Sequence, residues 1–300
     1  MKIIECVPNF SEGCDQAKME KIAAVFASFP GVRLVDFSGD PDHNRSVFTF
    51  LGRADDVLAA ALAAAGKALE VIDMRKQSGV HPRLGAVDVV PFIPLAEATM
   101  KDAVSLAHRF GQQFYERFDV PVYFYGAAAL VPARAELPNV RQGGYEALEK
   151  KMTVLQDIPD VGVPVFNKRS GATAVGARPP LVAYNINLNS SDLNLAREIA
   201  SRIREKNGGL KHVRAIGVGL KSRGLVQVSI NLTDYKKTPV KPVYDLVQAL
   251  AANHGVDILE SELIGLAPAA AFAGATAEYL KLKDYDKNRL VETYLKSFSL

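Results

Sequence analysis

A histidine on a stiff, cation-bearing loop is the first feature of the sequence that could do chemistry. Within residues 72–90, IDMRKQSGVHPRLGAVDVV, His81 is followed directly by Pro82 and Arg83. Pro82 fixes its own φ angle and biases His81 towards an extended backbone. An imidazole that titrates near ~6.5 when unperturbed, beside a guanidinium, could be a general acid or base next to an anion-binding group. The alternative is that His81 only caps a turn.

Other polar side chains stand where predicted strands meet loops. Asn9 follows the apolar run 3–7 and could form the wall of a site. Arg45 opens the predicted strand 45–51, where its guanidinium could face a carboxylate. A third polar group surrounds the predicted loop 38–44 and consists of Asp36, Asp40, Asp42 and His43. Their spacing fits no metal motif, so we expect no metal site.

The loop 157–176 is basic and marked by glycine and proline. A loop of this length usually has a function or joins two domains. It lacks the GxxxxGK[ST] pattern of a phosphate-binding loop. Its cations could still grip a ligand that carries carboxylates, and the alternative is a flexible linker.

The composition is that of a globular protein with two domains. The chain has 300 residues, of which 48% are hydrophobic and 23% charged, and this length exceeds the usual size of one domain. A net charge of +3 is too small to predict a nucleic-acid partner. Cys6 and Cys14 form no CxxC motif, which argues against a disulfide framework or a structural zinc. No signal peptide and no apolar run of membrane-spanning length is present, so we expect a soluble cytoplasmic protein.

Hydrophobic periodicity predicts alternating strands and helices in both halves. The predicted strands are 3–7, 32–37, 45–51, 86–93, 120–125, 180–188, 213–220, 225–232 and 256–264. The predicted helices are 16–29, 55–71, 99–118 (with Thr99 as N-cap and His108 on a solvated face), 145–152, 192–206 and 242–254, with helical segments from there to 300. The second half reads βαββαβ, the order of ferredoxin-like domains. The first half contains the same order with an added helix and strand. We therefore expect an α+β fold of two ferredoxin-like (βαββαβ) subdomains, residues 1–178 and 179–300, with a ligand groove between them.

Several sequence blocks, in order, resemble the formimidoyltransferase domain of glutamate formimidoyltransferase (formiminotransferase). They are ECVPNFSEG, HNRSVFTFLG, IDMRKQSGVHPRLGAVDVVPFIPL, VPVYFYG, RQGGYEAL and SGATAVGARPPLVAYNINL. The resemblance implies two α/β subdomains and a homodimer acting on small molecules. It also implies transfer of a formimidoyl group from N-formimidoylglutamate to tetrahydrofolate, within histidine breakdown and one-carbon metabolism. The chain ends before the cyclodeaminase domain of longer members, so that second activity is not expected.

The resemblance also assigns site residues. The family's catalytic histidine falls on His81, and we take Arg45, Arg83 and Asn9 as substrate-binding groups. The family's folate-binding segment falls on ten consecutive residues, namely Gly162, Val163, Pro164, Val165, Phe166, Asn167, Lys168, Arg169, Ser170 and Gly171. Among these, the two cations are expected to hold the folate tail. Tetrahydrofolate is then a co-substrate, and the chemistry needs no metal or redox cofactor.

Three alternative functions are compatible with the same sequence. One is formyl transfer between a formyl-folate and glutamate. The second is a folate-binding module without turnover, although His81 and the basic loop argue against a pure binder. The third is a structural interaction protein, which predicts no folate binding at all.

Overall fold

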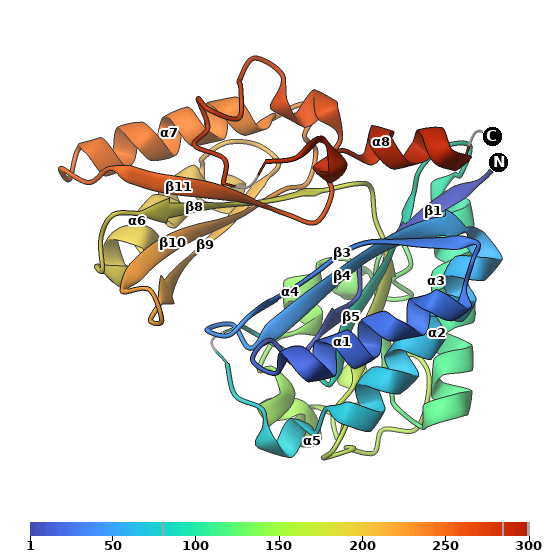
Figure 1. Ribbon diagram of the computed structural model, residues 1–300. Helices are drawn as coiled ribbons and strands as arrows, with labels where there is room; N and C mark the ends of the chain where they lie inside the picture. Colours follow the sequence, from blue (N-terminus) through green and yellow to red (C-terminus); the bar gives the residue numbers. More distant parts are fainter. Residues whose placement is uncertain (80, 284, 299–300) are drawn as a thin grey trace. The chain divides into compact units, whose positions relative to one another are not determined.

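The computed structural model describes residues 1–79, 81–283 and 285–298. The chain forms two compact units, Met1–Arg178 and Pro179–Leu300. Each unit has its own β-sheet and its own hydrophobic core (Figure 1). The predicted α+β fold class is confirmed, because each unit combines a mainly antiparallel sheet with helices packed against it.

The first unit is built on a seven-stranded sheet. Its strands are β1 (Ile3–Cys6), β2 (Asn9–Phe10), β3 (Val32–Asp40), β4 (Arg45–Arg53), β5 (Val87–Pro94), β6 (Val122–Gly126) and β7 (Thr173–Ala177). β1 and β2 follow each other along the sheet, antiparallel to both β4 and β5. The order β5-β1-β4-β3 is that of a ferredoxin-like βαββαβ unit. β7 and β6 extend it beyond β5 as parallel strands.

Two predictions for this sheet are wrong. The sequence predicts a loop over 38–44, but β3 continues to Asp40. It also predicts a loop over 157–176, yet β7 begins at Thr173 and lies between two parallel neighbours. All five residues of β7 are buried, so the strand lacks the polar alternation that marks a half-exposed strand. Its Gly176 leaves no room for a side chain beside the ring of Tyr125.

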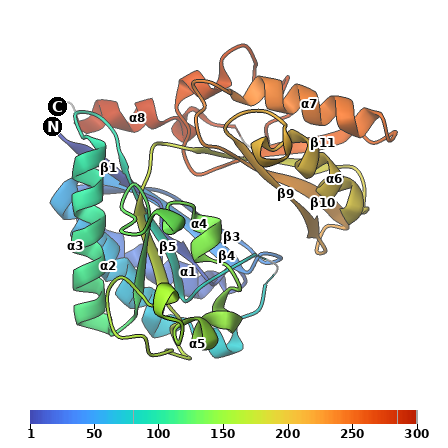
Figure 2. The ribbon, with the colours of Figure 1, turned by 180° about the vertical axis from the view of Figure 1, so that it is seen from behind.

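Helices cover both faces of this sheet. α1 (Gln16–Ala24), α2 (Ala54–Val71) and α3 (Met100–Phe118) pack on one face with the larger core cluster. α4 (Leu137–Val140) and α5 (Leu148–Lys151) belong to a segment that packs with a smaller cluster on the other face (Figure 2). Short 3₁₀ turns occupy Val25–Ser28, Met74–Lys76, Pro132–Arg134, Tyr145–Ala147 and Leu155–Asp157. The strands β5, β6 and β7 are therefore held between two packed layers.

The long helix α3 shows one correct and one wrong prediction. Thr99 caps it as predicted, in a reciprocal capping box with Asp102. His108 does not lie on a solvated face. Its Nε2 is 2.8 Å from the carbonyl oxygen of Ala128, and its ring packs edge-on against Phe124 at 4.6 Å. The ring therefore joins the helix to the turn after β6.

The second unit has the same βαββαβ order without the extension. Its elements are β8 (Val182–Leu188), α6 (Leu193–Ile203), β9 (Val213–Leu220), β10 (Leu225–Leu232), α7 (Val240–Ala252) and β11 (Ile258–Ile264). The strand order β11-β8-β10-β9 is antiparallel throughout. The hairpin of β9 and β10 has the predicted bounds, and both helices pack with the core of this unit.

Beyond β11 the predicted run of helices is wrong over most of its length. The structure has 3₁₀ turns at Ala269–Phe272, Lys287–Arg289 and Lys296–Phe298, and one short helix, α8 (Val291–Leu295). Isolated bridges tie this segment back to the unit, for example between Ser261 and Leu282. Gly265 and Gly274, both at positive φ, interrupt any helical run. Residues 284, 299 and 300 of that prediction lie outside the described part of the chain.

Candidate functional site

One edge of the first sheet gathers the polar residues that the sequence singled out. The first residues of β4 and β5 flank β2, since Phe10 pairs with both Ser46 and Val87. β7 starts beside β5 in parallel register, with Val89 opposite Ala174. The loops that lead into β4, β5 and β7 therefore meet at this edge. They carry the predicted groups of Arg45, His81 and the segment 162–171.

A buried guanidinium forms the centre of the site. The side chain of Arg45 is 11% exposed, and its Nη1 donates to Oδ2 of the fully buried Asp88 at 2.5 Å. Its Nε donates to Oδ1 of Asn9 at 2.9 Å, and its Nη2 also donates to that oxygen. Asn9 in turn donates to the carbonyl of Val7 at 2.8 Å. Arg45 is thus held in place by two protein acceptors, and few of its donors remain for a ligand.

His81 contacts this guanidinium. Its Nδ1 lies 2.9 Å from Nη1 of Arg45 and 2.8 Å from the carbonyl oxygen of Pro82. A guanidinium only donates, so a bond from Arg45 requires a lone pair on Nδ1 and a proton on Nε2. A carbonyl only accepts, so a bond to Pro82 requires the opposite tautomer. Either tautomer of the neutral ring satisfies one of the two contacts, whereas the imidazolium would turn an N–H towards Arg45.

Burial and charge both disfavour the imidazolium. The pKa of His81 lies well below its usual value because the ring is desolvated and because Arg45 and Arg141 are nearby. Burial and the charge of Arg141 lower the pKa of Arg45 to about 10, against the opposing effect of Asp88. Arg45 therefore keeps its proton at neutral pH, and His81 is uncharged.

An open cavity of about 460 Å³ lies beside His81. Arg83, Arg141 and Glu146 line it, together with the backbone of Gly79, Pro82, Gly143 and Gly144. Arg83 is 13% exposed, and its Nη2 donates to Glu146 at 2.7 Å and to the carbonyl of Gln77 at 3.1 Å. Two guanidinium groups, those of Arg83 and Arg141, thus line the cavity beside His81, and Arg45 contacts the imidazole directly.

The structure brings together the predicted His81, Arg45, Arg83 and Asn9, and it adds two residues that sequence reasoning missed. Asp88 is a lone acid inside the apolar strand β5, and its Oδ1 accepts from the backbone N–H of Leu84 at 2.9 Å. A charge in an otherwise apolar buried strand needs a partner, which is the signal that could have found it. Arg141 lies in a loop and had no such signal from its neighbours, although it opens the block RQGGYEAL that carries the family resemblance.

The predicted folate-binding segment packs against the His81 loop. Backbone N–H groups of Met74 and Ala86 donate to the carbonyls of Arg169 and Ser170, each at 2.9 Å. The Arg169 guanidinium donates to the carbonyl of Glu70 at 2.9 Å and lies 3.8 Å from the carboxylate of Asp73. Both expected tail-binding cations are exposed, and Arg169 already has partners within the protein.

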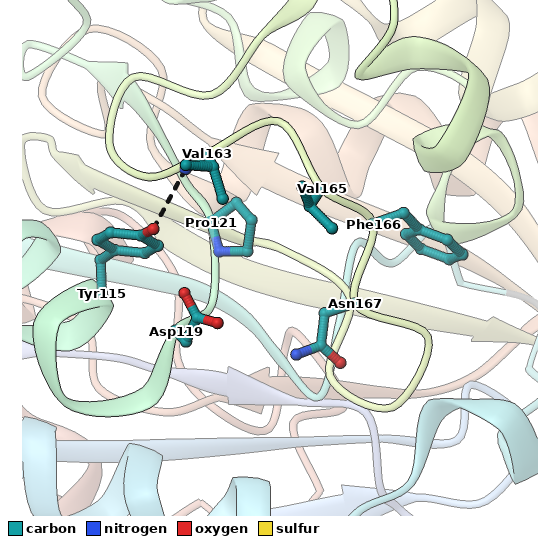
Figure 3. Close-up of a pocket in the computed structure, with 7 residues that line it drawn as sticks. All are labelled: Tyr115, Asp119, Pro121, Val163, Val165, Phe166 and Asn167. Carbon is teal, nitrogen blue, oxygen red and sulfur yellow. Dashed lines mark hydrogen bonds between the residues drawn. The ribbon is translucent and has the colours of Figure 1, made fainter.

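A second, smaller cavity of about 230 Å³ adjoins this segment (Figure 3). Its lining comes from the end of α3, the start of β6 and the segment itself, and consists of Tyr115, Asp119, Pro121, Val163, Val165, Phe166 and Asn167. Figure 3 shows the hydroxyl of Tyr115 accepting from the backbone N–H of Val163, at 3.4 Å. The exposed valines give the cavity an apolar rim, and Asp119 adds a carboxylate.

Residues 1–79, 81–283 and 285–298 contain neither a candidate metal site nor a candidate membrane-spanning helix. Within them, histidine, cysteine and acidic side chains form no group of three or more that could hold a metal ion, and this includes the acid-rich turn after β3. No helix in the same residues is long and apolar enough to cross a membrane.

The structure is that of an α+β protein with an arginine-lined cavity beside a histidine, and comparison with known proteins gives the family. A family model described as formiminotransferase domain, N-terminal subdomain, matches residues 3–178. A second, described as formiminotransferase domain, matches residues 183–298. The chain therefore belongs to the formiminotransferase domain family, and the resemblance seen in the sequence is confirmed.

Curated relatives agree with this assignment. The chain is 41% identical to glutamate formimidoyltransferase of Thermoplasma acidophilum, over 97% of each chain. It is 39% identical to glutamate formimidoyltransferase of Streptococcus pyogenes serotype M1, over 98% of this chain and 99% of that one. It is also 43% identical to formimidoyltransferase-cyclodeaminase of Gallus gallus, over 93% of this chain and 53% of the relative.

Proposed function

We propose that this enzyme transfers the formimidoyl group from N-formimidoyl-L-glutamate to tetrahydrofolate, giving formimidoyl-tetrahydrofolate and L-glutamate. The near full-length similarity to two glutamate formimidoyltransferases supports the reaction. The observation that carries the mechanism is the neutral His81 at a cavity lined by guanidinium groups. That arrangement combines a proton acceptor with groups that bind carboxylates.

His81 serves both proton transfers of the reaction. The folate amine attacks the amidine carbon, a C–N bond forms, and the amine proton passes to Nε2 of His81. With Nδ1–H directed at the Pro82 carbonyl, Nε2 carries the free lone pair that this step requires. The imidazolium then formed beside Arg45 and Arg141 is a strong acid, so it gives the proton to the glutamate nitrogen as the second C–N bond breaks. No net charge accumulates and no redox partner is consumed.

The other predicted residues take different roles. Arg45 sets a positive charge beside His81, and Asn9 and Asp88 hold the Arg45 side chain in place by accepting its hydrogen bonds. Arg83 lines the cavity and can exchange its partner Glu146 for a substrate carboxylate, because Glu146 is 64% exposed and its carboxylate is readily solvated when the pair opens. Holding donor and acceptor together supplies much of the rate through proximity.

Tetrahydrofolate binds at the segment 162–171 in this proposal. The cavity beside Tyr115 offers an apolar rim for a ring and the carboxylate of Asp119 for its N–H groups. Lys168 holds the carboxylate-bearing tail. The two compact units act as the N-terminal subdomain with His81 and a C-terminal subdomain, and the enzyme works as a cytoplasmic homodimer on small molecules, without nucleic acid, membrane or metal. Light scattering on a gel-filtration column tests the dimer.

Steady-state turnover of N-formimidoylglutamate with tetrahydrofolate tests the function, with wild type and His81→Ala side by side. A positioned acid/base group typically contributes about 10²–10⁴ in rate. We expect a loss of that size in kcat, with folate binding by calorimetry retained. A fully active variant would return His81 to the role of a turn residue. A wild type that binds folate but turns over only N-formylglutamate would replace the formimidoyl donor by a formyl donor.

A further inference from the structure

The cavity beside His81 contains a guanidinium to which no role has yet been given. Arg141 follows α4 and is 12% exposed. Its Nη2 donates to Oδ2 of Asp88 at 2.5 Å, and this is the one hydrogen bond that its guanidinium makes within the described residues. Its buried Nε has no acceptor among them. Because a guanidinium carries five N–H donors, most of the capacity of Arg141 is unused.

The charges around the cavity do not balance. Arg45, Arg83 and Arg141 are 11%, 13% and 12% exposed, and all are cationic. They face one fully buried carboxylate, Asp88, and the 64% exposed Glu146. The imidazoles of His81 and His43, whose rings lie 5.7 Å apart, add no negative charge. Buried cations are costly unless an anion completes the set, so a negatively charged ligand group fits here.

We propose that Arg141 binds one carboxylate of the amino-acid donor, and that Asp88 is the positioning residue that fixes this anchor relative to His81. The inference deepens the proposed function and rests on it. A planar carboxylate suits a guanidinium because two parallel N–H···O bonds form together. Oδ2 of Asp88 accepts from both Arg45 and Arg141. One buried oxygen thus links the guanidinium that contacts the imidazole to the guanidinium that binds the ligand.

Asp88 also ties this link to the loop of the catalytic histidine. Its Oδ1 accepts from the backbone N–H of Leu84, three residues after His81. Ligand anchor, imidazole and loop are thereby fixed to one rigid strand, β5, which is buried along nearly its whole length. A donor whose carboxylate sits on Arg141 is held at a set distance from the proton acceptor, which is the condition for a proximity effect.

The test combines substitutions of Arg141 with amidation of either carboxylate of the donor. Turnover is measured for N-formimidoyl-L-glutamate and for its two mono-amides, in wild type, Arg141→Met and Arg141→Lys. A charge-assisted hydrogen bond predicts that amidation of the anchored carboxylate costs the wild type about 10- to 100-fold in kcat/KM, mainly through KM. In Arg141→Met the same amidation should lower kcat/KM less than about threefold. We call this loss of kcat/KM on amidation the discrimination of the enzyme. Equal discrimination in wild type and Arg141→Met would overturn the proposal.

Three controls separate this result from a general loss of structure. Arg109→Met removes an equal charge from an exposed pair with Asp55 on the helices, and it should discriminate like wild type. Arg141→Lys keeps the charge without the bidentate geometry and should show an intermediate effect, which also serves if the methionine variant does not fold. Asp88→Asn should lower discrimination and kcat together. Unchanged discrimination in folded Asp88→Asn would remove its positioning role.

The pH profile gives a readout that structural damage would not mimic. The charge of Arg141 helps to lower the pKa of His81. The acid limb of kcat/KM should therefore move to higher pH in Arg141→Met and stay in place in Arg141→Lys. If no donor turns over, the proposed function fails, and calorimetry with L-glutamate and L-glutamine still tests the anchor. Equal binding of L-glutamate by wild type and folded Arg141→Met would then refute the anchor alone.

Discussion

Nδ1 of His81 lies 2.9 Å from Nη1 of Arg45, and the same guanidinium nitrogen donates to the buried carboxylate of Asp88 at 2.5 Å. This relationship places a permanent positive charge against the imidazole of the site. Together with desolvation of the ring, which is the larger cause, this charge lowers the pKa of His81 and favours a neutral proton acceptor in the resting enzyme. It also makes the imidazolium short-lived once formed, which suits a reaction that takes a proton and returns it in the next step.

The first prediction concerns Arg45→Met. Removing the guanidinium raises the pKa of His81, because one of the charges that lower it is gone. The acid limb of kcat/KM should shift to higher pH, and kcat should fall on the order of 10²-fold because the ring is less well positioned. Nitrogen chemical shifts of the ring should show the Nδ1–H tautomer in both proteins, and more fully in the variant, because Nη1 of Arg45 no longer competes with the Pro82 carbonyl for Nδ1. An unshifted acid limb would show that the two groups are not coupled.

The second prediction concerns the packing of the folate-binding segment. Gly171 has a φ of +71°, and a Cβ there would overlap the carbonyl oxygen of Leu84 and lie 2.7 Å from Cα of Gly85. Gly171→Ala should lower the free energy of unfolding by about 2–4 kcal/mol, from backbone strain plus overpacking. Gly224 has a φ of +65°, and a Cβ there would meet no atom within 4 Å. Gly224→Ala should therefore lower the free energy of unfolding by the backbone strain alone, about 1 kcal/mol.

Urea unfolding of both variants measures the difference. Gly171→Ala should also weaken folate binding, because the segment can no longer lie against the His81 loop. Equal losses of stability in the two variants would mean that the close contact of Gly171 with this loop contributes nothing.

The third prediction concerns the folate tail. Lys168 is exposed in the predicted folate-binding segment. Lys168→Gln should raise the KM for tetrahydrofolate about 2- to 5-fold with kcat unchanged, since an exposed ion pair contributes little. The effect should grow with added glutamates on the tail and fade at high salt. Lys101→Gln, an equal charge change at the start of α3, is the matched control. If the KM for tetrahydrofolate is the same in both variants, Lys168 does not bind the folate tail.

The fourth prediction concerns pH and stability. Burial raises the pKa of Glu5, on β1, to about 7, against the opposing charge of Arg178. The folded state therefore binds this proton more tightly than the unfolded state, in which the carboxyl has its ordinary pKa of 4.5. The free energy of unfolding should fall as pH rises from about 4.5 through 7, by up to about 3 kcal/mol. Glu5→Gln should flatten this part of the profile in thermal unfolding. The fourth prediction fails if the wild type and Glu5→Gln profiles stay parallel between pH 4.5 and 7.

Much of the architecture follows from local sequence signals. The alternation in 225–232, the Thr99 capping box and the βαββαβ order of the second half are local patterns, and the structure confirms them. The strand β7, which the sequence did not predict, and the mostly non-helical end of the chain have no such local pattern. A fully buried strand of small residues has no alternation to detect, and bridges to β11 replace the predicted helix.

For the site, the sequence determined the identity and order of the reacting groups. Gly79, His81, Pro82 and Arg83 stand in one short loop, and the sequence blocks around them already indicate the family. The tertiary structure alone decided what surrounds the imidazole. Asp88 and Arg141 are 53 residues apart in the chain, and they meet because the segment after β6 folds back over the sheet. The protonation state of His81 depends on desolvation and on charges from distant segments, so no local pattern could specify it.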